Sequence, residues 1–164
     1  MASKQDKRRR VVITGMGALT PLGNSVDEFW QGCVEGRSGI DWITLFDNSA
    51  YPVKVDGEVR NFDPTEYMDR KEARRMARFS QLSVAAARMA VEDSRIDLEK
   101  EDTARIGVLL GNGNGGYPET DDAMRTIMTK GGNRLDPFYM SKILPNIAAA
   151  QVAMSSACAA TTTP

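Results

Sequence analysis

The chain has 164 residues, of which 41% are hydrophobic and 26% charged, and this length and balance suit one globular domain with a hydrophobic core. The formal net charge of −1 argues against nucleic acid or an anionic membrane as a general partner. No apolar run reaches transmembrane length, and the basic residues 1–10 lead into no apolar signal-peptide region, so we expect a cytoplasmic protein. Cys33 and Cys158 are far apart in unlike contexts, which does not suggest a disulfide framework, and we expect neither a metal nor another cofactor.

The first predicted elements are a strand and a helix. Residues 11–14 are a short β-branched run that ends at glycine, which is typical of a buried strand entering a tight turn. Ser25 with Glu28 three residues later is a capping box, and apolar residues then recur at helical spacing until Gly36 offers a stop. Cys33 belongs to that apolar stripe, so we expect it in the core.

Strands and helices continue to alternate along the rest of the chain. Residues 41–52 read as a loop and residues 53–59 alternate like an exposed strand. Residues 70–93 contain no Gly or Pro and predict one long helix, and residues 106–110 predict another buried strand. Two further helices are expected, at 119–130 and 147–154. The pattern predicts an α/β fold with a mostly parallel sheet covered by helices on both faces, in one domain over residues 11–164 after a basic tail.

Cys158 is the candidate nucleophile. It stands in SSACAATTT, a run of small residues that would allow a sharp backbone turn and a close approach of substrate to the sulfur. A cysteine reacts as the thiolate, and a place at a helix N-terminus would lower its pKa and supply an N–H for an oxyanion. The alternative for this residue alone is a small buried hydrophobic side chain.

Several separated segments resemble β-ketoacyl-acyl carrier protein synthase II, in the order of that family. They are residues 9–24 (RRVVITGMGALTPLGN), 29–40, 69–81, 105–116 and 144–153, with the short ACAA around Cys158 as a sixth. The resemblance implies a thiolase-like fold, of which this chain is the N-terminal half, and a homodimer. It also implies an acyltransferase of fatty acid biosynthesis, in which an acyl group on Cys158 undergoes decarboxylative Claisen condensation with malonyl-acyl carrier protein.

A basic face is expected on the helix after residue 69. Lys71, Arg74, Arg75 and Arg78 recur at spacings of three and four, which places them on one helix face, and an ordinary solvated face is the alternative. The resemblance implies that Lys71, Arg74 and Arg75 meet the acidic acyl carrier protein, and that Arg134 is a further docking position. Such complementary charge mainly accelerates and orients docking.

The resemblance also implies an acyl pocket. Asn114 occupies a glycine-loop position that is usually apolar in the family and gates the pocket, so its polar side chain leaves chain-length preference open. Phe138, Tyr139 and Met140 match a segment that borders the same pocket. Ordinary core aromatics are the alternative for these residues.

Two departures from the family pattern limit what this chain could do. The resemblance implies a glycine-containing loop and a strand between the helix ending near Met154 and the cysteine, but Ser155 follows at once, so we hypothesise that the sequence joins residues across a gap at 154/155. The family's C-terminal half, with two histidines and a lysine, is absent, and this chain contains no histidine. We therefore expect the chain by itself to be inactive in condensation.

Two rival functions remain open. Gly111, Gly113 and Gly116 satisfy GxGxxG after a predicted strand, which would suit a dinucleotide-binding oxidoreductase. Residues 117–119 argue against it, because they separate the loop from the predicted helix and add negative charge where phosphate would lie. A non-catalytic ketosynthase partner, which determines chain length, is the other rival, and retention of Cys158 argues against that.

Overall fold

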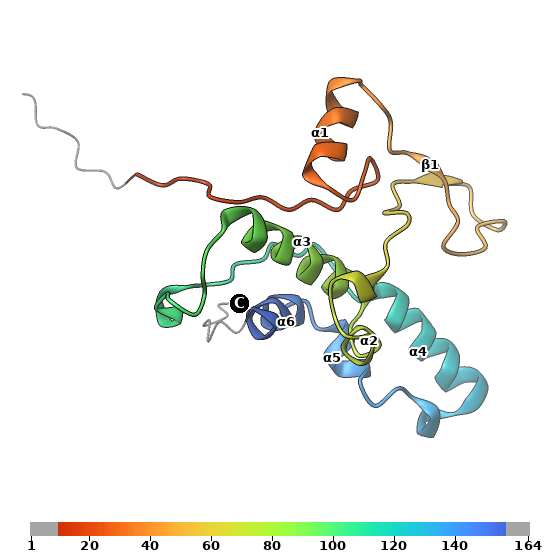
Figure 1. The fold of residues 1–164 in the computed structure, drawn as a ribbon. Coiled ribbons are helices and arrows are strands. Elements are labelled where there is room, and N and C mark those ends of the chain that lie inside the picture. The colour runs from red at the N-terminus through yellow and green to blue at the C-terminus, as the bar shows by residue number, and fades with distance from the viewer. Residues whose placement is uncertain (1–9, 157–164) are drawn as a thin grey trace, which may run out of the picture.

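The computed structural model describes residues 10–156, and its described part is mostly helical (Figure 1). Its α-helices are α1 (Val26–Val34), α2 (Arg70–Ala73), α3 (Arg78–Ser94), α4 (Tyr117–Lys130), α5 (Tyr139–Ile143) and α6 (Ile147–Ser155). Three single 3₁₀ turns separate them: η1 (Pro64–Glu66), η2 (Thr103–Arg105) and η3 (Gly132–Arg134). Strands β1 (Asp41–Trp42) and β2 (Val55–Asp56) pair antiparallel.

Helix α1 forms where the capping pattern predicts it. The Glu28 N–H donates to Ser25 Oγ over 3.2 Å, and Glu28 Oε2 accepts from the backbone N–H of the residue before Ser25 over 2.7 Å. Gly36, with a φ of +66°, ends the helix in the left-handed conformation that glycine adopts without strain.

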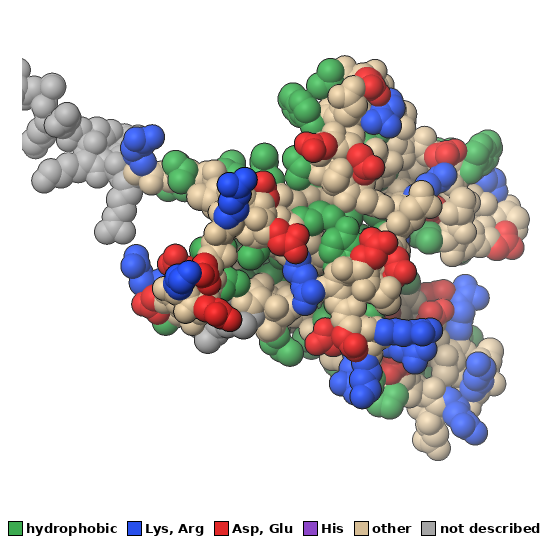
Figure 2. All heavy atoms as spheres, viewed as in Figure 1, with side chains coloured by type: hydrophobic (Ala, Val, Ile, Leu, Met, Phe, Trp, Pro, Cys, Tyr) green, Lys and Arg blue, Asp and Glu red, His purple; other side chains and the backbone are tan. Residues whose placement is uncertain are grey.

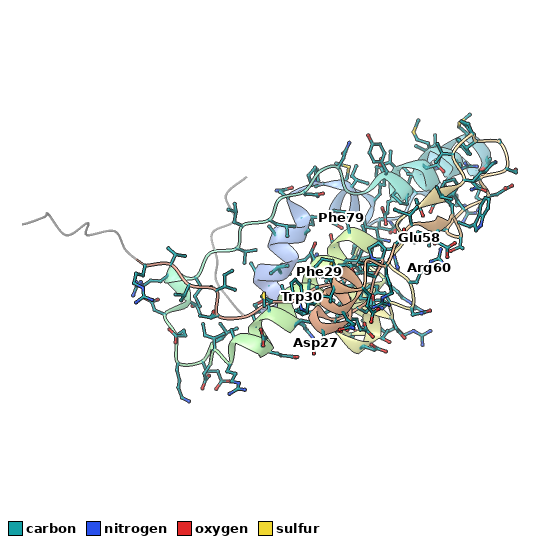
Figure 3. All side chains as sticks on the ribbon, turned by 90° about the horizontal axis from the view of Figure 1, so that it is seen from above. Asp27, Phe29, Trp30, Glu58, Arg60 and Phe79 are labelled. Atoms are coloured by element: carbon teal, nitrogen blue, oxygen red, sulfur yellow. The ribbon has the colours of Figure 1, made fainter. Side chains whose placement is uncertain are left out.

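The prediction that Cys33 is a core residue is wrong in the described structure, because its side chain is exposed. Most of the apolar stripe of α1 faces outward, and Trp30 is 66% exposed (Figure 3). Helix α1 instead packs through Gly32, where an added β-carbon would lie 3.1 Å from the Leu22 side chain. A small residue on the polar side of the helix therefore decided which face turned inward.

The hydrophobic core lies where α3 and α6 pack side by side (Figure 1). Val84 of α3 and Val152 of α6 are buried there, and their helices meet through small side chains, which allow a close approach. The core extends to the region before α3 through three buried residues, Met68, Ala73 and Met76. Helix α2 is thus attached to the core through its buried residue Ala73.

The single helix predicted over residues 70–93 is broken in the structure into α2 and α3. The break occurs where Met76 and Ala77 are both buried, and Ala77 takes extended backbone angles (φ −71°, ψ 158°). Gln81 Nε2 donates to the Ala73 carbonyl over 2.8 Å, which gives a hydrogen-bond donor to a carbonyl at the C-terminal end of α2. The chain therefore turns at Ala77 and begins a new helix at Arg78, while both side chains remain in the core.

The two predicted buried strands do not join a sheet among the described residues. Residues 11–14 and 106–110 have no strand partner, and the sheet formed by residues 10–156 is the β1–β2 pair. The first segment is followed by Gly15, which lies so close to α3 that an added β-carbon would clash with the carbonyl oxygen of Ala90. Most of the large apolar side chains of the two segments remain exposed to solvent. Val11, Ile13 and Leu109 are 94%, 82% and 86% exposed. Among residues 10–156 these two segments therefore remain unpaired, because a strand needs a hydrogen-bonded neighbour.

Candidate functional site: the basic surface and the glycine loop

Cys158, the predicted nucleophile, lies outside the described residues, so its role stays a prediction. Helix α6 leads toward it and passes through Met154 and Ser155 without interruption. Its last turn closes with the Ser156 N–H donating to the Val152 carbonyl over 3.1 Å. The hypothesis of a sequence gap at 154/155 also stays a prediction.

Lys71 lies on the short helix α2 and Arg74 at its C-cap, and both are exposed cations. Asp69 caps this helix, since its Oδ1 accepts from the Lys71 N–H over 2.7 Å. Among residues 10–156, neither Lys71 nor Arg74 is in an ion pair. Figure 2 shows Lys and Arg side chains gathered over this region. We call Lys71, Arg74 and Arg75 the basic surface.

The structure separates the four predicted basic residues into two kinds. The Arg75 guanidinium carbon lies 4.9 Å from the centre of the Phe138 ring, and Arg75 remains exposed. Arg78 is half-buried: it lies over Phe62 at 5.4 Å and donates to the Val59 carbonyl over 2.7 Å. The prediction that Arg78 shares the exposed face is wrong, because the break between α2 and α3 turns it inward.

Arg134 lies apart from α2 in sequence and in structure, on η3 after α4. Its side chain is exposed, and within residues 10–156 it makes no ion pair. It is thus available to a charged partner, but the contacts of the structure do not join it to the basic surface.

The glycine loop packs between α3 and α5. A β-carbon at Gly115 would lie 2.7 Å from the Phe79 ring, and one at Gly116 would lie 2.6 Å from the Ile143 Cα. Gly116 also has a φ of +79° and immediately precedes α4. The expected interval of residues 117–119 between the loop and the helix is therefore wrong, although Glu119 does place negative charge in the first turn.

The three predicted acyl-pocket residues are not brought together in the described part of the chain. Asn114 is exposed and its Nδ2 donates to the Tyr117 hydroxyl over 2.8 Å. Phe138 lies under Arg75. Tyr139 lines a separate cavity of about 120 Å³ between α4 and α5, together with Glu119, Asp122, Ala123, Thr126, Leu135, Asp136 and Lys142.

Asp136 fixes the start of α5. Its Oδ1 accepts from the Phe138 N–H over 2.9 Å, and its Oδ2 pairs with Lys142 Nζ at 2.6 Å. The hydrogen bond from Lys142, followed by that from the Phe138 N–H, lowers the pKa of the Asp136 carboxyl group below its ordinary value. Asp136 therefore stabilises the turn into α5 through contacts within residues 136–142.

Glu58 is a buried carboxylate that sequence reasoning missed. It accepts from the Thr44 N–H over 2.7 Å and the Leu45 N–H over 3.0 Å, and its other oxygen accepts from the Thr44 hydroxyl. The bond from the Thr44 hydroxyl is the largest cause of the lowered pKa of Glu58. Arg60 lies next to it at 4.0 Å and binds Asp41 at 2.9 Å (Figure 3). This network holds the loop between β1 and β2, and alternation in residues 53–59 was its only sequence signal.

The described part of the chain shows two further absences. Within residues 10–156, no helix is both long and apolar enough to cross a membrane. The same residues contain no group of three His, Cys, Asp or Glu side chains that could hold a metal ion.

Comparison with known proteins decides the family. The family model described as "Beta-ketoacyl synthase, N-terminal domain" matches residues 8–162. The chain belongs to this family. The predicted resemblance is thereby confirmed, and the dinucleotide-binding alternative is set aside.

The β-ketoacyl synthase relatives agree in sequence and in fold. The 3-oxoacyl-[acyl-carrier-protein] synthase 2 of Staphylococcus aureus (strain COL) is 43% identical over 148 residues, which are 90% of this chain and 36% of the relative. The chain thus spans about a third of the length of the curated relatives it matches.

Solved structures show the same fold. The ishigamide ketosynthase/chain length factor superposes with a TM-score of 0.88 at 28% identity, covering 95% of this chain and 39% of the other. A type II polyketide ketosynthase in complex with its acyl carrier protein, AntDE:AntF, superposes with a TM-score of 0.76 at 26% identity, covering 95% and 41%. The thiolase-like fold class, N-terminal half, is confirmed.

Proposed function

We propose that this chain is the nucleophile-bearing part of a β-ketoacyl-[acyl carrier protein] synthase of fatty acid biosynthesis. The observation that carries the proposal is the 43% identity to a 3-oxoacyl-[acyl-carrier-protein] synthase 2 over 90% of the chain. Membership of the family supports a ketosynthase of fatty acid or polyketide type, and the name of that relative favours fatty acids.

The proposed reaction has two stages at Cys158. The thiolate attacks the carbonyl carbon of an acyl-carrier thioester, a new C–S bond forms, the C–S bond to the carrier breaks, and the carrier leaves as a thiolate that takes up a proton. Malonyl-carrier protein then loses CO₂, and its carbanion carbon attacks the acyl group on Cys158. The C–C bond forms, the C–S bond to Cys158 breaks, and the product is β-ketoacyl-carrier protein with the thiolate regenerated.

The second stage needs donors that this chain does not contain. Loss of CO₂ places negative charge on the malonyl thioester oxygen, and hydrogen-bond donors aimed at that oxygen lower the barrier. The resemblance implies that two histidines and a lysine supply and support them, but this chain has no histidine. We therefore assign acyl transfer to Cys158 in this chain and condensation to the whole synthase.

The basic surface is the proposed docking site for acyl carrier protein. Lys71 and Arg74 are exposed and without an ion pair in the described part of the chain, and α2 is anchored by buried Ala73. An acidic partner would gain charge-assisted contacts there without breaking existing ion pairs. The solved complex of another ketosynthase with its carrier protein supports this class of partner. Arg75 and Arg134 are further proposed contacts.

The acyl pocket is proposed to lie beside the glycine loop. Asn114 and the segment with Phe138 and Tyr139 would border it in the whole synthase. The hydrogen bond between Asn114 and Tyr117 makes this border polar. Homodimer formation and a cytoplasmic location remain predictions of the same proposal.

Acylation followed by mass spectrometry tests the function. The full-length protein incubated with an acyl-carrier thioester should gain one acyl group at Cys158, and adding malonyl-carrier protein should release β-ketoacyl-carrier protein. Cys158→Ala should abolish both steps. Acylation of another residue, or condensation that survives Cys158→Ala, would refute the mechanism.

A non-catalytic ketosynthase partner is the second candidate. The TM-score of 0.88 to the ishigamide ketosynthase/chain length factor favours it. Such a partner determines chain length without being acylated, so the acylation experiment separates the two candidates. Retention of Cys158 supports the enzyme.

A further inference from the structure

Arg75 differs from Lys71 and Arg74 of the basic surface because its guanidinium lies against an aromatic ring and can also donate hydrogen bonds. Its guanidinium carbon lies 4.9 Å from the centre of the Phe138 ring, within the range of a cation–π interaction. A guanidinium stacked by its face keeps its N–H groups at the edge for hydrogen bonds. Lys71 and Arg74 have no such aromatic contact in the described part of the chain.

Phe138 stands at the start of α5, and the two ends of this helix are held differently. Its C-terminal end is fixed, because Ile143 lies directly against Gly116 of the glycine loop. At its N-terminal end, Asp136 bonds the Phe138 N–H and Lys142, so these contacts stay within the same segment. They shape the turn without attaching it to the rest of the molecule.

Helix α5 contacts α4, but a cavity interrupts this contact. Tyr139 and Asp136 line the cavity of about 120 Å³ that separates them from Ala123 and Asp122 of α4. An empty space contributes no dispersion contacts that would hold the segment. The contact from Arg75 therefore connects the start of α5 to α2 and to the core beneath it.

We propose that Arg75 is a positioning residue that holds the Phe138–Tyr139 segment and thereby sets acyl-chain selectivity from within the basic surface. The inference rests on the proposed function, in which this segment borders the acyl pocket. Docking residues act only when the substrate arrives on the carrier protein. Arg75 acts on every substrate, including small thioesters that need no carrier.

Steady-state kinetics of the full-length synthase with hexanoyl and myristoyl N-acetylcysteamine thioesters test the inference. Arg75→Gln should change the ratio of the two kcat/KM values about two- to fivefold, the size expected from losing one exposed cation–π contact. Arg75→Lys, which keeps the charge but not the planar stack, should recover part of the original ratio.

Two further variants separate positioning from general damage. Phe138→Leu should also change the ratio, and adding Arg75→Gln to Phe138→Leu should change it no further, because the contact between the two side chains is already gone. Arg78→Gln is the matched control: it removes a similar stacked guanidinium, over Phe62, and should leave the ratio unchanged.

The outcomes distinguish this inference from the proposed function. An active wild-type synthase whose ratio is unaffected by Arg75→Gln, or fully additive effects of Arg75→Gln and Phe138→Leu, would overturn the inference alone. A ratio that changes only with carrier-bound substrates would make Arg75 a docking residue and would also overturn it. A wild-type protein without condensing activity would refute the proposed function itself.

Discussion

Glu58 is the clearest example of a single residue whose charge organises its surroundings. Only 5% of the residue is exposed, and two backbone N–H groups and one hydroxyl donate to its carboxylate. Those donors stabilise the ionised form, so the folded-state pKa lies below the ordinary 4.5. The carboxylate thus contributes stability at neutral pH.

The pH dependence of unfolding follows from that direction. A carboxyl group with a lowered folded-state pKa stabilises the fold above its unfolded value of 4.5 and loses this contribution as pH falls through the lowered pKa. Glu58→Gln should therefore lower the melting temperature at neutral pH. The difference in melting temperature between this variant and the wild type should become smaller as the pH falls below 4.5. Calorimetry over this range checks it, with the exposed Glu101→Gln as control. An equal difference at every pH would contradict the assignment.

Charge reversal at the basic surface tests docking. Lys71→Glu with Arg74→Glu should raise KM for acyl-carrier substrates by about tenfold or more, because two attractive contacts become repulsive. The effect should shrink at high salt, which screens exposed charges. Kinetics with carrier-bound and N-acetylcysteamine substrates provide the comparison. Equal losses with both substrate types would refute the docking role.

The glycine loop shows how an element depends on one close approach. Gly116 combines a φ of +79° with a position where a β-carbon would lie 2.6 Å from the Ile143 Cα. The loop can therefore enter α4 while it packs against α5 only with glycine at this position.

Gly116→Ala should destabilise the protein by about 2 kcal/mol or more, since left-handed backbone alone costs about 1–2 kcal/mol for alanine. Gly113→Ala is the matched control, because no atom lies within 4 Å of its added β-carbon. Denaturant unfolding of both variants measures the difference. Equal effects of the two substitutions would show that the approach to Ile143 does not constrain the loop.

Residues 10–156 expose many large apolar side chains. Side chains such as Trp30 and Leu109 extend into solvent from the outward stripe of α1 and from segments 11–14 and 106–110. Large apolar patches of this kind normally pack against other protein. The chain also spans about a third of the length of its curated relatives.

We expect the 164-residue chain, expressed by itself, to self-associate and bind a hydrophobic dye. Light scattering and dye fluorescence at increasing concentration check this, with the full-length synthase as the reference. Trp30→Gln should reduce dye binding, since it removes one large exposed ring from α1. A monodisperse, dye-free monomer would contradict the expectation.

The amino-acid sequence by itself determined several of the helices and the family. The helices after Ser25, after Gly116 and after Asn146 follow from caps, glycines and apolar spacing, which act within a few residues. The ordered motifs identified the family without any knowledge of packing.

Only the tertiary structure decided which faces are covered. It broke the helix predicted over residues 70–93 at the buried residues Met76 and Ala77, and after this break Arg78 is half-buried while Arg75 lies against Phe138. It also turned Cys33 outward, because α1 packs through a glycine. Periodicity shows that a helix has an apolar side, but burial depends on residues far away in the chain that arrive to cover it.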